Sequence, residues 1–235
     1  MPSWTRDAFL EECLGYPVFH LKALHSSSEA IAAATGFSNW LIDARVPAER
    51  LGDLASLTTQ GFRVVDTNVQ LSRAPIVAQG AEKCRFATAA DEPSVRAIAA
   101  TAFSQTRFHA DPLIRAADAN RIKEEWVANF FRGRRGEWMI VAEDGDRIDG
   151  FLQVLRRAGD TLVIDLIAVA ERARGKGVAS AMIEFAAEAC LGRPAGMLVG
   201  TQIANTGSLG LYTRLGFRVE SAAYVLHLHR QDWVQ

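Results

Sequence analysis

The pattern of apolar and polar positions divides the chain into two α/β segments. In the first segment the pattern predicts short strands at 17–21 and 40–44, a helix over 48–60 and a strand over 62–71. The stretch 72–83 shows little periodicity, so we expect the boundary between the two segments there.

The second segment begins at Cys84 and predicts a longer alternation of elements. After a strand over 85–88, Asp91-Glu92-Pro93 begins a helix, because Asp suits an N-cap and Pro suits a first turn. The order predicts an α/β protein with a mixed sheet. The remaining predicted elements are a helix (117–131), a hairpin (137–143 and 148–156), a strand (161–169), a helix (177–191), a strand (197–202), a helix (207–215) and a strand (217–229).

A short internal similarity connects the two segments. The stretch from Leu57 to Val64 resembles the stretch from Leu211 to Val219, with a difference of one residue in length. Any junction of helix, glycine and strand has this form, so local chemistry and a duplicated, degenerate half-domain explain the similarity equally well. We predict a small α/β domain over 1–80 and a main domain over 84–235.

Composition excludes several classes of protein. The 235 residues are 49% hydrophobic, with 26 Lys and Arg against 27 Asp and Glu, which are globular proportions without a basic surplus for nucleic acid or anionic membranes. The start has no signal-peptide pattern, and no apolar run approaches the roughly 20 residues that span a bilayer. Three distant cysteines predict neither a disulfide scaffold nor a metal site, and they favour a cytoplasmic protein.

A basic, glycine-rich loop follows the strand over 161–169. In Arg172-Ala173-Arg174-Gly175-Lys176-Gly177 the glycines let the backbone approach an anion, and the next helix offers its free N–H groups. The GxxxxGKS/T pattern and the third glycine of GxGxxG are both absent, which excludes a P-loop and a Rossmann loop. Taken alone, the loop is equally compatible with a basic surface turn.

A second motif supplies a family resemblance. The stretch from Asn205 to Phe217 resembles the N-x-x-A/S-x-x-L-Y-x-x-x-G-F signature of the GNAT acetyltransferase superfamily. The loop matches that superfamily's Q/R-x-x-G-x-G/A signature as Arg172-x-x-Gly175-x-Gly177. The resemblance covers 84–229 and implies the GNAT fold, in which a mixed α/β sheet has a splayed centre.

The resemblance also implies a reaction, in which an amine attacks the thioester of acetyl-CoA. A backbone N–H at Val169 would stabilise the oxyanion, and Tyr212 would donate a proton to the departing thiolate, unless Tyr212 is only a packed helix residue. The pyrophosphate would bind the amides from Ala173 to Ala179. The implied residues for the co-substrate are Ile167, Val169, Arg172, Ala173, Arg174, Gly175, Lys176, Gly177, Val178, Ala179 and Asn205.

The general base remains open. Many relatives carry an acidic residue on the strand before the Asn motif, but 199–202 contains no carboxylate. Asp165, Asp66 and His109 are candidates, and a relay of water is an alternative.

The acceptor is suggested by residues 102–112. This segment and the N-terminal half resemble those family members that N-acetylate a nucleotide-linked 4-amino-4,6-dideoxy sugar. Arg107 would then meet a diphosphate, Phe108 would stack on a base or sugar, and His109 or Asp111 would bind hydroxyls. The alternative is that the aromatic residues are core and the polar ones cap a helix. The arginines at 132, 134 and 135 predict a solvated turn, and His227 and His229 predict surface or interface positions.

Other functions remain compatible with the sequence. The acceptor could be an amino acid, an antibiotic or a protein N-terminus, or the chain could be a non-catalytic acyl-CoA-binding module, against which the intact Tyr212 argues. We expect a small-molecule amine as partner, with no nucleic acid, membrane or metal. The N-terminal half could supply acceptor specificity or a homodimer interface.

Overall fold

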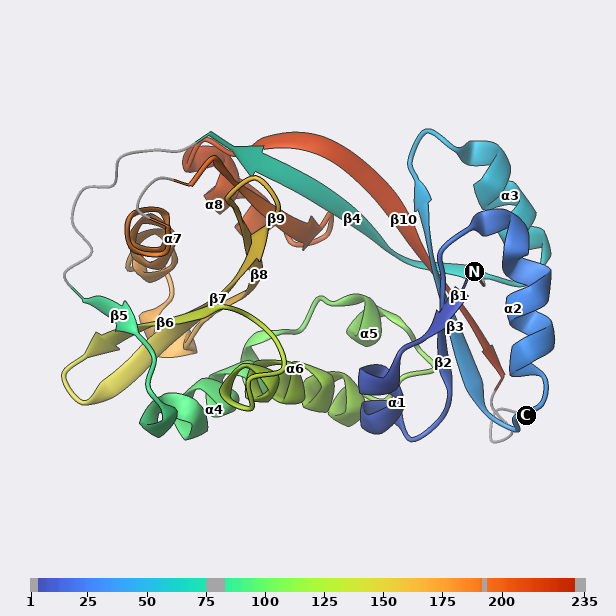
Figure 1. Cartoon of the computed structure of the whole chain (residues 1–235), viewed down its shortest axis with the longest axis horizontal. Coiled ribbons are helices and arrows are strands. Elements are labelled where there is room, and N and C mark those ends of the chain that lie inside the picture. The colour runs from blue at the N-terminus through green and yellow to red at the C-terminus, as the bar shows by residue number, and fades with distance from the viewer. Residues whose placement is uncertain (1–3, 75–82, 192–193, 231–235) are drawn as a thin grey trace.

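The computed structural model describes residues 4–74, 83–191 and 194–230, and one sheet runs through all three stretches (Figure 1). Its ten described strands follow the order β1-β2-β3-β10-β4-β9-β8-β7-β6-β5. The strands are β1 (Trp4–Arg6), β2 (Val18–Leu21), β3 (Trp40–Pro47), β4 (Arg63–Arg73), β5 (Cys84–Phe86), β6 (Trp138–Asp144), β7 (Arg147–Arg157), β8 (Thr161–Val169), β9 (Gly196–Gln202) and β10 (Arg218–Arg230).

Helices cover both faces of the C-terminal half of the sheet. Alternate residues of the strands pack against α4 and α6 on one face, where Phe151 and Leu166 are buried, and against α7 and α8 on the other, where Leu152 is buried. The described helices are α1 (Ala8–Leu14), α2 (Ser27–Ala34), α3 (Leu51–Thr59), α4 (Glu92–Ala102), α5 (Arg107–Ala110), α6 (Ala116–Phe131), α7 (Val178–Ala189) and α8 (Thr206–Arg214), with 3-10 turns η1 (Leu24–Ser26), η2 (Ala89–Asp91) and η3 (Glu171–Ala173).

The predicted mixed α/β class is confirmed, and each predicted strand and helix is present with bounds shifted by a few residues. The pattern missed only short elements, namely β1, α1, α2 and α5. These span three to eight residues and offer too few turns or alternations to carry a periodic signal.

The two halves exchange strands. In the first half β3, α3 and β4 follow one another, and in the second half β9, α8 and β10 do the same. Strand β4 pairs with β9, whereas β10 pairs with β3, so each half completes the sheet of the other (Figure 1). Both helices end at a glycine with positive φ, Gly61 at 94° and Gly216 at 81°. The duplicated half-domain remains a prediction that this arrangement favours.

The sheet separates at its centre. Strands β8 and β9 pair in parallel only from Thr161–Ile164 against Gly196–Val199. Beyond Ile164, strand β8 continues to Val169 with β7 as its partner, while β9 stays paired with β4. The backbone of β8 therefore has an unpaired edge facing the gap, as the family resemblance implied.

The boundary predicted at 72–83 falls largely on 75–82, outside the described residues. The sheet continues through both predicted domains, and the division into 1–80 and 84–235 remains a prediction. No helix in the described stretches is both long and apolar enough to cross a lipid bilayer.

Candidate active site

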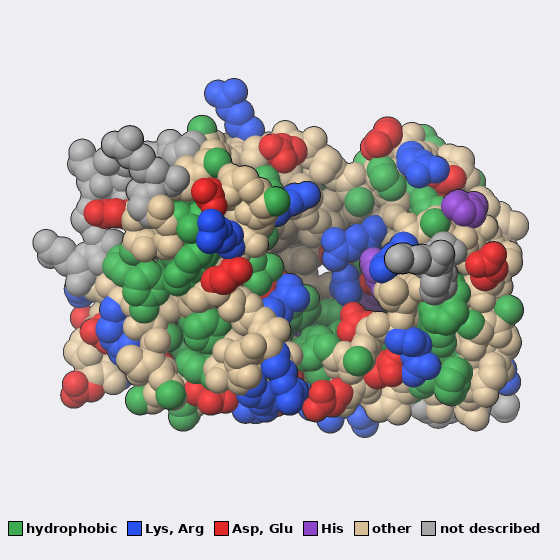
Figure 2. Space-filling view, in the orientation of Figure 1, with side chains coloured by type: hydrophobic (Ala, Val, Ile, Leu, Met, Phe, Trp, Pro, Cys, Tyr) green, Lys and Arg blue, Asp and Glu red, His purple; other side chains and the backbone are tan. Residues whose placement is uncertain are grey.

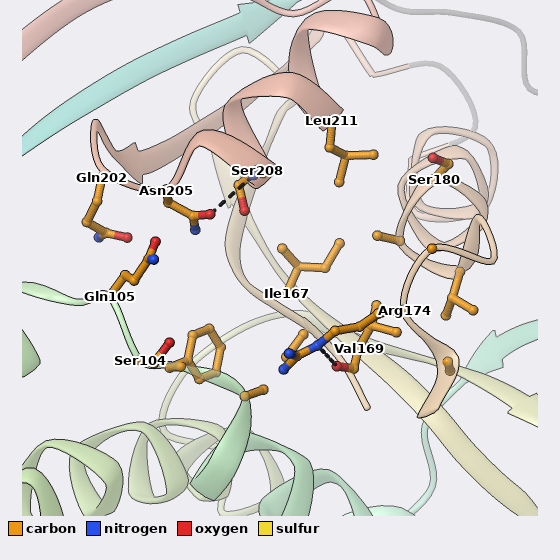
Figure 3. A pocket seen from close by; sticks show the side chains of 18 of the residues that line it. Ser104, Gln105, Ile167, Val169, Arg174, Ser180, Gln202, Asn205, Ser208 and Leu211 are labelled. Atoms are coloured by element: carbon orange, nitrogen blue, oxygen red, sulfur yellow. Dashed lines mark hydrogen bonds between the residues drawn. The ribbon is translucent and has the colours of Figure 1, made fainter. Parts of the chain in front are cut away.

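A cavity of about 730 Å³ occupies the gap between β8 and β9 (Figure 3). Its walls are the end of β8, the glycine loop with the start of α7, the first turns of α8, and the segment 102–106 after α4. Most of the residues that the family resemblance assigns to the co-substrate line this cavity. They are Ile167, Val169, Ala173, Arg174, Gly175, Gly177, Val178, Ala179 and Asn205.

The glycine loop needs its two glycines for their backbone conformation. Gly175 has φ of 75° and Gly177 has φ of 80°, a region that side chains with a Cβ rarely adopt. Gly177 is the N-cap of α7, whose first N–H groups have no partner within the helix and lie beside the cavity. The loop therefore presents backbone donors and the positive end of the helix dipole to an anion.

Arg172 does not line the cavity, and its guanidinium group instead contacts β7. Its Nη2 donates a hydrogen bond to the Ile148 carbonyl at 2.7 Å and pairs with Asp149 Oδ1 at 2.9 Å. These contacts fasten the loop to β7. Lys176 is exposed and lies outside the cavity lining, whereas Arg174 lines it and donates to the Val169 carbonyl at 3.4 Å.

Helix α8 presents Asn205 and Ser208 to the cavity. The side-chain oxygen of Asn205 accepts a hydrogen bond from the Ser208 N–H at 3.2 Å and so caps the helix (Figure 3). Its amide nitrogen stays available to a ligand. Gln105 and Gln202, which sequence reasoning did not single out, face the same space from opposite walls (Figure 3).

Tyr212 lies one residue beyond Leu211, which lines the cavity, but is itself outside the described lining. It is 2% exposed, and its ring packs edge-on against Phe217 with 5.4 Å between centroids. Burial raises the pKa of Tyr212 above its usual value of about 10, so the phenol keeps its proton at neutral pH. The proton-donor role stays a prediction, since it requires the thiolate to reach this hydroxyl.

Two of the three candidate bases, Asp165 and His109, are already held by neighbouring side chains. Asp165 is held by Arg135 at 2.6 Å and by Trp126 Nε1 at 2.9 Å. His109 is held on both ring nitrogens, by Thr106 Oγ1 at 2.7 Å and Asn120 Oδ1 at 2.9 Å. Both side chains are thus committed to structural contacts.

Asp66, the third candidate, has no ion pair with any described residue. It stands on β4, beside β9, and its carboxylate accepts a hydrogen bond from Gln202, which lines the cavity. Burial raises the pKa of Asp66, although the Thr67 and Gln202 hydrogen bonds and the charges of Arg107 and Arg45 oppose this shift. A carboxylate with a raised pKa is a stronger base.

Two of the predicted acceptor residues belong to the core instead. Phe108 is 2% exposed and packs in the cluster of α1 and α6, so it does not offer a face for stacking. Asp111 is 3% exposed and accepts hydrogen bonds from His227 at 2.6 Å and His229 at 2.7 Å. For His227, which is 2% exposed, a surface position is wrong, because its carboxylate partner comes from a distant segment.

The buried carboxylates and imidazole stabilise one another's charges. Burial alone would raise the pKa of Asp111, but the hydrogen bonds from His227 and His229 hold it well below its usual range. Burial opposes a charge on His227, yet its hydrogen bond to Asp111 and the nearby carboxylate of Asp43, 3.6 Å away, raise its pKa. His20 also contacts Asp43, at 2.6 Å. This network joins β3, α5 and β10.

The same network contains the one potential metal-ligand set in the described residues. The donor atoms of Asp111, His227 and His229 lie within 4.8 Å of one another. The Asp111 oxygen is closer to both ring nitrogens than ligands placed about 2.0 Å from a tetrahedral zinc would be to each other. The arrangement fits hydrogen bonds, and the expectation of no metal stays a prediction.

Replacing Asp111 with Asn is expected to destabilise the fold by about 3 kcal/mol at pH 7, because His227 then loses a buried charged partner. Thermal unfolding should shift down by roughly 6–12 °C. The pKa of Asp111 is lowered in the fold, so its stabilisation is lost as pH falls, and the difference from wild type should shrink below about pH 4. Asp146→Asn, in an exposed hairpin turn, is the control. Equal unfolding temperatures at pH 7 would contradict this account.

A second cavity, of about 590 Å³, lies between the strands of the N-terminal half and the end of α6. It is lined by α1, β2, β3, the end of α6 and Arg107 at the start of α5. Figure 2 shows Lys and Arg side chains gathered around the hollow between the lobes. Arg134 and Arg135, expected in a solvated turn, both line this cavity.

Lys123 is a further residue that the sequence did not reveal. It stands on α6, 8% exposed, with its Nζ 5.4 Å from the centroid of the Phe103 ring and 4.4 Å from that of Trp126. Burial, assisted by the charge of Arg107, lowers the pKa of Lys123 to about 7. Phe103 lines the first cavity and Trp126 the second, so Lys123 lies between them.

Comparisons with known proteins agree with this geometry. The chain is 29% identical to dTDP-fucosamine acetyltransferase of Escherichia coli over 189 residues, which cover 79% of this chain and 80% of that protein. It is 30% identical over 139 residues to the spore coat polysaccharide biosynthesis protein SpsD of Bacillus subtilis, covering 59% of this chain and about half (47%) of SpsD. The predicted resemblance to acetyltransferases of nucleotide-linked amino sugars is thereby confirmed.

The fold has counterparts among solved structures. A GCN5-related N-acetyltransferase from Sphaerobacter thermophilus superposes with a TM-score of 0.60 over 93% of this chain and 74% of that one, at 15% sequence identity. Residues 94–217, more than half of the chain, match the acetyltransferase (GNAT) family. The chain therefore belongs to the GNAT family of acetyltransferases, whose co-substrate is acetyl-CoA.

Proposed function

We propose that the chain transfers the acetyl group of acetyl-CoA directly to the amine of a small acceptor, a nucleotide-linked 4-amino-deoxy sugar. The observation that carries the proposal is the cavity at the splay, walled on one side by the glycine loop and on the other by Asn205. The acceptor class rests on the 29% identity to dTDP-fucosamine acetyltransferase, which extends into the N-terminal half. That half contributes β4, and with it Asp66, to the cavity region.

Each end of acetyl-CoA has matching groups in the cavity. The unpaired edge of β8 at Ile167 and Val169 is suited to the pantetheine amides, which would extend the sheet in place of a strand. The pyrophosphate matches the backbone donors between Ala173 and Ala179. Asn205 supplies an amide nitrogen to the same arm.

The chemistry follows from this orientation. The acceptor nitrogen attacks the thioester carbonyl, and the Val169 N–H would donate to the oxyanion as its charge develops. Collapse of the intermediate breaks the C–S bond, and the second proton of the attacking nitrogen passes to the departing thiolate by way of the Tyr212 hydroxyl, which regains the proton that it donates. Because the pKa of the buried Tyr212 is raised, its main contribution would be a hydrogen bond to the sulfur.

Asp66 is the base we propose for the acceptor amine. It would take one proton from the ammonium form of the substrate before attack, which leaves a neutral nucleophile and a protonated carboxyl group. The proposal is supported by the contact of Asp66 with Gln202, which lines the cavity. The strand exchange thus supplies from β4 the carboxylate that 199–202 lacks.

Release of free thiol from acetyl-CoA, followed against a panel of amines, tests this function. The panel includes dTDP-4-amino sugars, free amino sugars, amino acids, aminoglycosides and a peptide N-terminus. We expect turnover on the nucleotide-linked sugar to exceed turnover on all the others. Preference for an amino acid, an antibiotic or a peptide would replace the proposed acceptor. Binding of acetyl-CoA without turnover on any amine would favour a binding module.

A further inference from the structure

The second cavity is continuous in sequence with the wall of the first. Residues 102–106 line the cavity at the splay, and the next residue, Arg107, lines the second cavity. Asp66 lies near both cavities. Its carboxylate contacts Gln202 of the first cavity, and the charges of Arg107 and Arg45 of the second cavity lower its pKa. Residues 102–107 and Asp66 therefore lie between the two cavities.

The second cavity carries cations that the fold does not neutralise. Arg45 on β3 lines the hollow and forms no ion pair with any described residue. Arg134 likewise has no ion pair in the described part of the chain. The Nε of Arg107 is buried without a hydrogen-bond acceptor among the described atoms. An unsatisfied buried donor is costly unless a ligand satisfies it.

The carboxylates around this cavity are mostly engaged elsewhere. Asp43 is 3% exposed and is surrounded by His20 at 2.6 Å and Arg107 at 3.3 Å. Asp7 accepts a hydrogen bond from the Leu10 N–H as the cap of α1. The cavity lining contains four arginines against three carboxylates, those of Asp7, Glu12 and Asp43, so its formal charge is positive.

We propose that the second cavity binds the diphosphate of the acceptor, with Arg45, Arg107 and Arg134 as its ligands. This inference rests on the proposed function and names the part of the substrate that the N-terminal half recognises. Guanidinium groups suit phosphate oxygens, because each can donate two parallel hydrogen bonds. The ring of Trp126 already has two cations against it, Lys123 at 4.4 Å and Arg135 at 4.7 Å from its centroid, so we expect the site to select for the phosphates rather than for a stacked base.

Isothermal titration of dTDP into the protein saturated with CoA tests the proposal. Saturation matters because dTDP could otherwise occupy the pyrophosphate loop at Gly175 and Gly177. We expect dTDP to bind more tightly than dTMP, and thymidine not to bind measurably. Arg45→Gln and Arg134→Gln, the latter in an exposed turn where misfolding is not expected, should each weaken dTDP binding at least about tenfold. Arg157→Gln, exposed at the end of β7 and outside the cavity lining, should leave it unchanged.

Equal dTDP affinity in wild type and both cavity variants would overturn the proposal, as would binding that saturating CoA abolishes. The proposed function fails separately. Arginine-dependent dTDP binding without thiol release on any amine would refute the reaction but keep the subsite. Turnover on a nucleotide-linked sugar with an unchanged KM in Arg45→Gln and Arg134→Gln would refute the diphosphate subsite but keep the reaction.

Discussion

Tyr212→Phe is expected to lower kcat by about a hundredfold or more, while the Kd of acetyl-CoA and the unfolding temperature change little. The substitution removes only the hydroxyl group, and the ring retains its packing against Phe217. Without that hydroxyl the thiolate leaves with no hydrogen-bond donor from α8. Steady-state thiol release and titration with acetyl-CoA separate the catalytic effect from the binding effect.

Tyr224→Phe is the matched control, because Tyr224 is a half-buried tyrosine on β10 that packs against the N-terminal core. It should retain wild-type kcat. If Tyr212→Phe also turns over at the wild-type rate, Tyr212 is a core residue of α8 and the proton-donor role is wrong.

Asp66→Asn is expected to lower kcat/KM about 10²- to 10⁴-fold at pH 7 and to change the pH profile. In the wild type, activity should be lost on the acid side as Asp66 is protonated, above the usual carboxyl pKa of about 3.9, since burial raises the pKa of Asp66. The variant has no base and depends on amine that is already neutral. Its acid limb should therefore move up to the pKa of the amine, about 8, with activity recovering at higher pH.

The exposed α3 carboxylate, in Asp53→Asn, provides a comparison that should keep the wild-type profile. An Asp66→Asn variant with an unaltered acid limb would show that water or another group removes the proton. Lys123, with a pKa lowered to about 7 and a place between the two cavities, would then be the next base to test.

The sequence allowed prediction of the parts of the site that are local in the chain. Gly175 and Gly177 follow a strand and precede a helix, so their place in the cavity wall and their positive φ depend on neighbours in sequence. The same holds for Asn205, whose capping position is set by the start of α8. The long strands and helices have enough period to be located from the pattern alone.

The remaining features depend on contacts between distant segments. The position of Asp66 follows from the insertion of β4 between β9 and β10, and no pattern in the sequence specifies strand order. The burial of Asp111 depends on histidines more than a hundred residues away in the chain. Arg172 matched the family signature, yet its charge is used by the Ile148 carbonyl and Asp149, which only the fold brings near.

Mass spectrometry of the product formed from acetyl-CoA and a dTDP-4-amino-4,6-dideoxy sugar tests the central claim most directly. We predict an intact nucleotide sugar heavier by one acetyl group, carried on the amine, with one free CoA thiol released for each product molecule. A nucleotide sugar that stays unmodified, while acetyl-CoA binds normally to the protein, would contradict the proposed function.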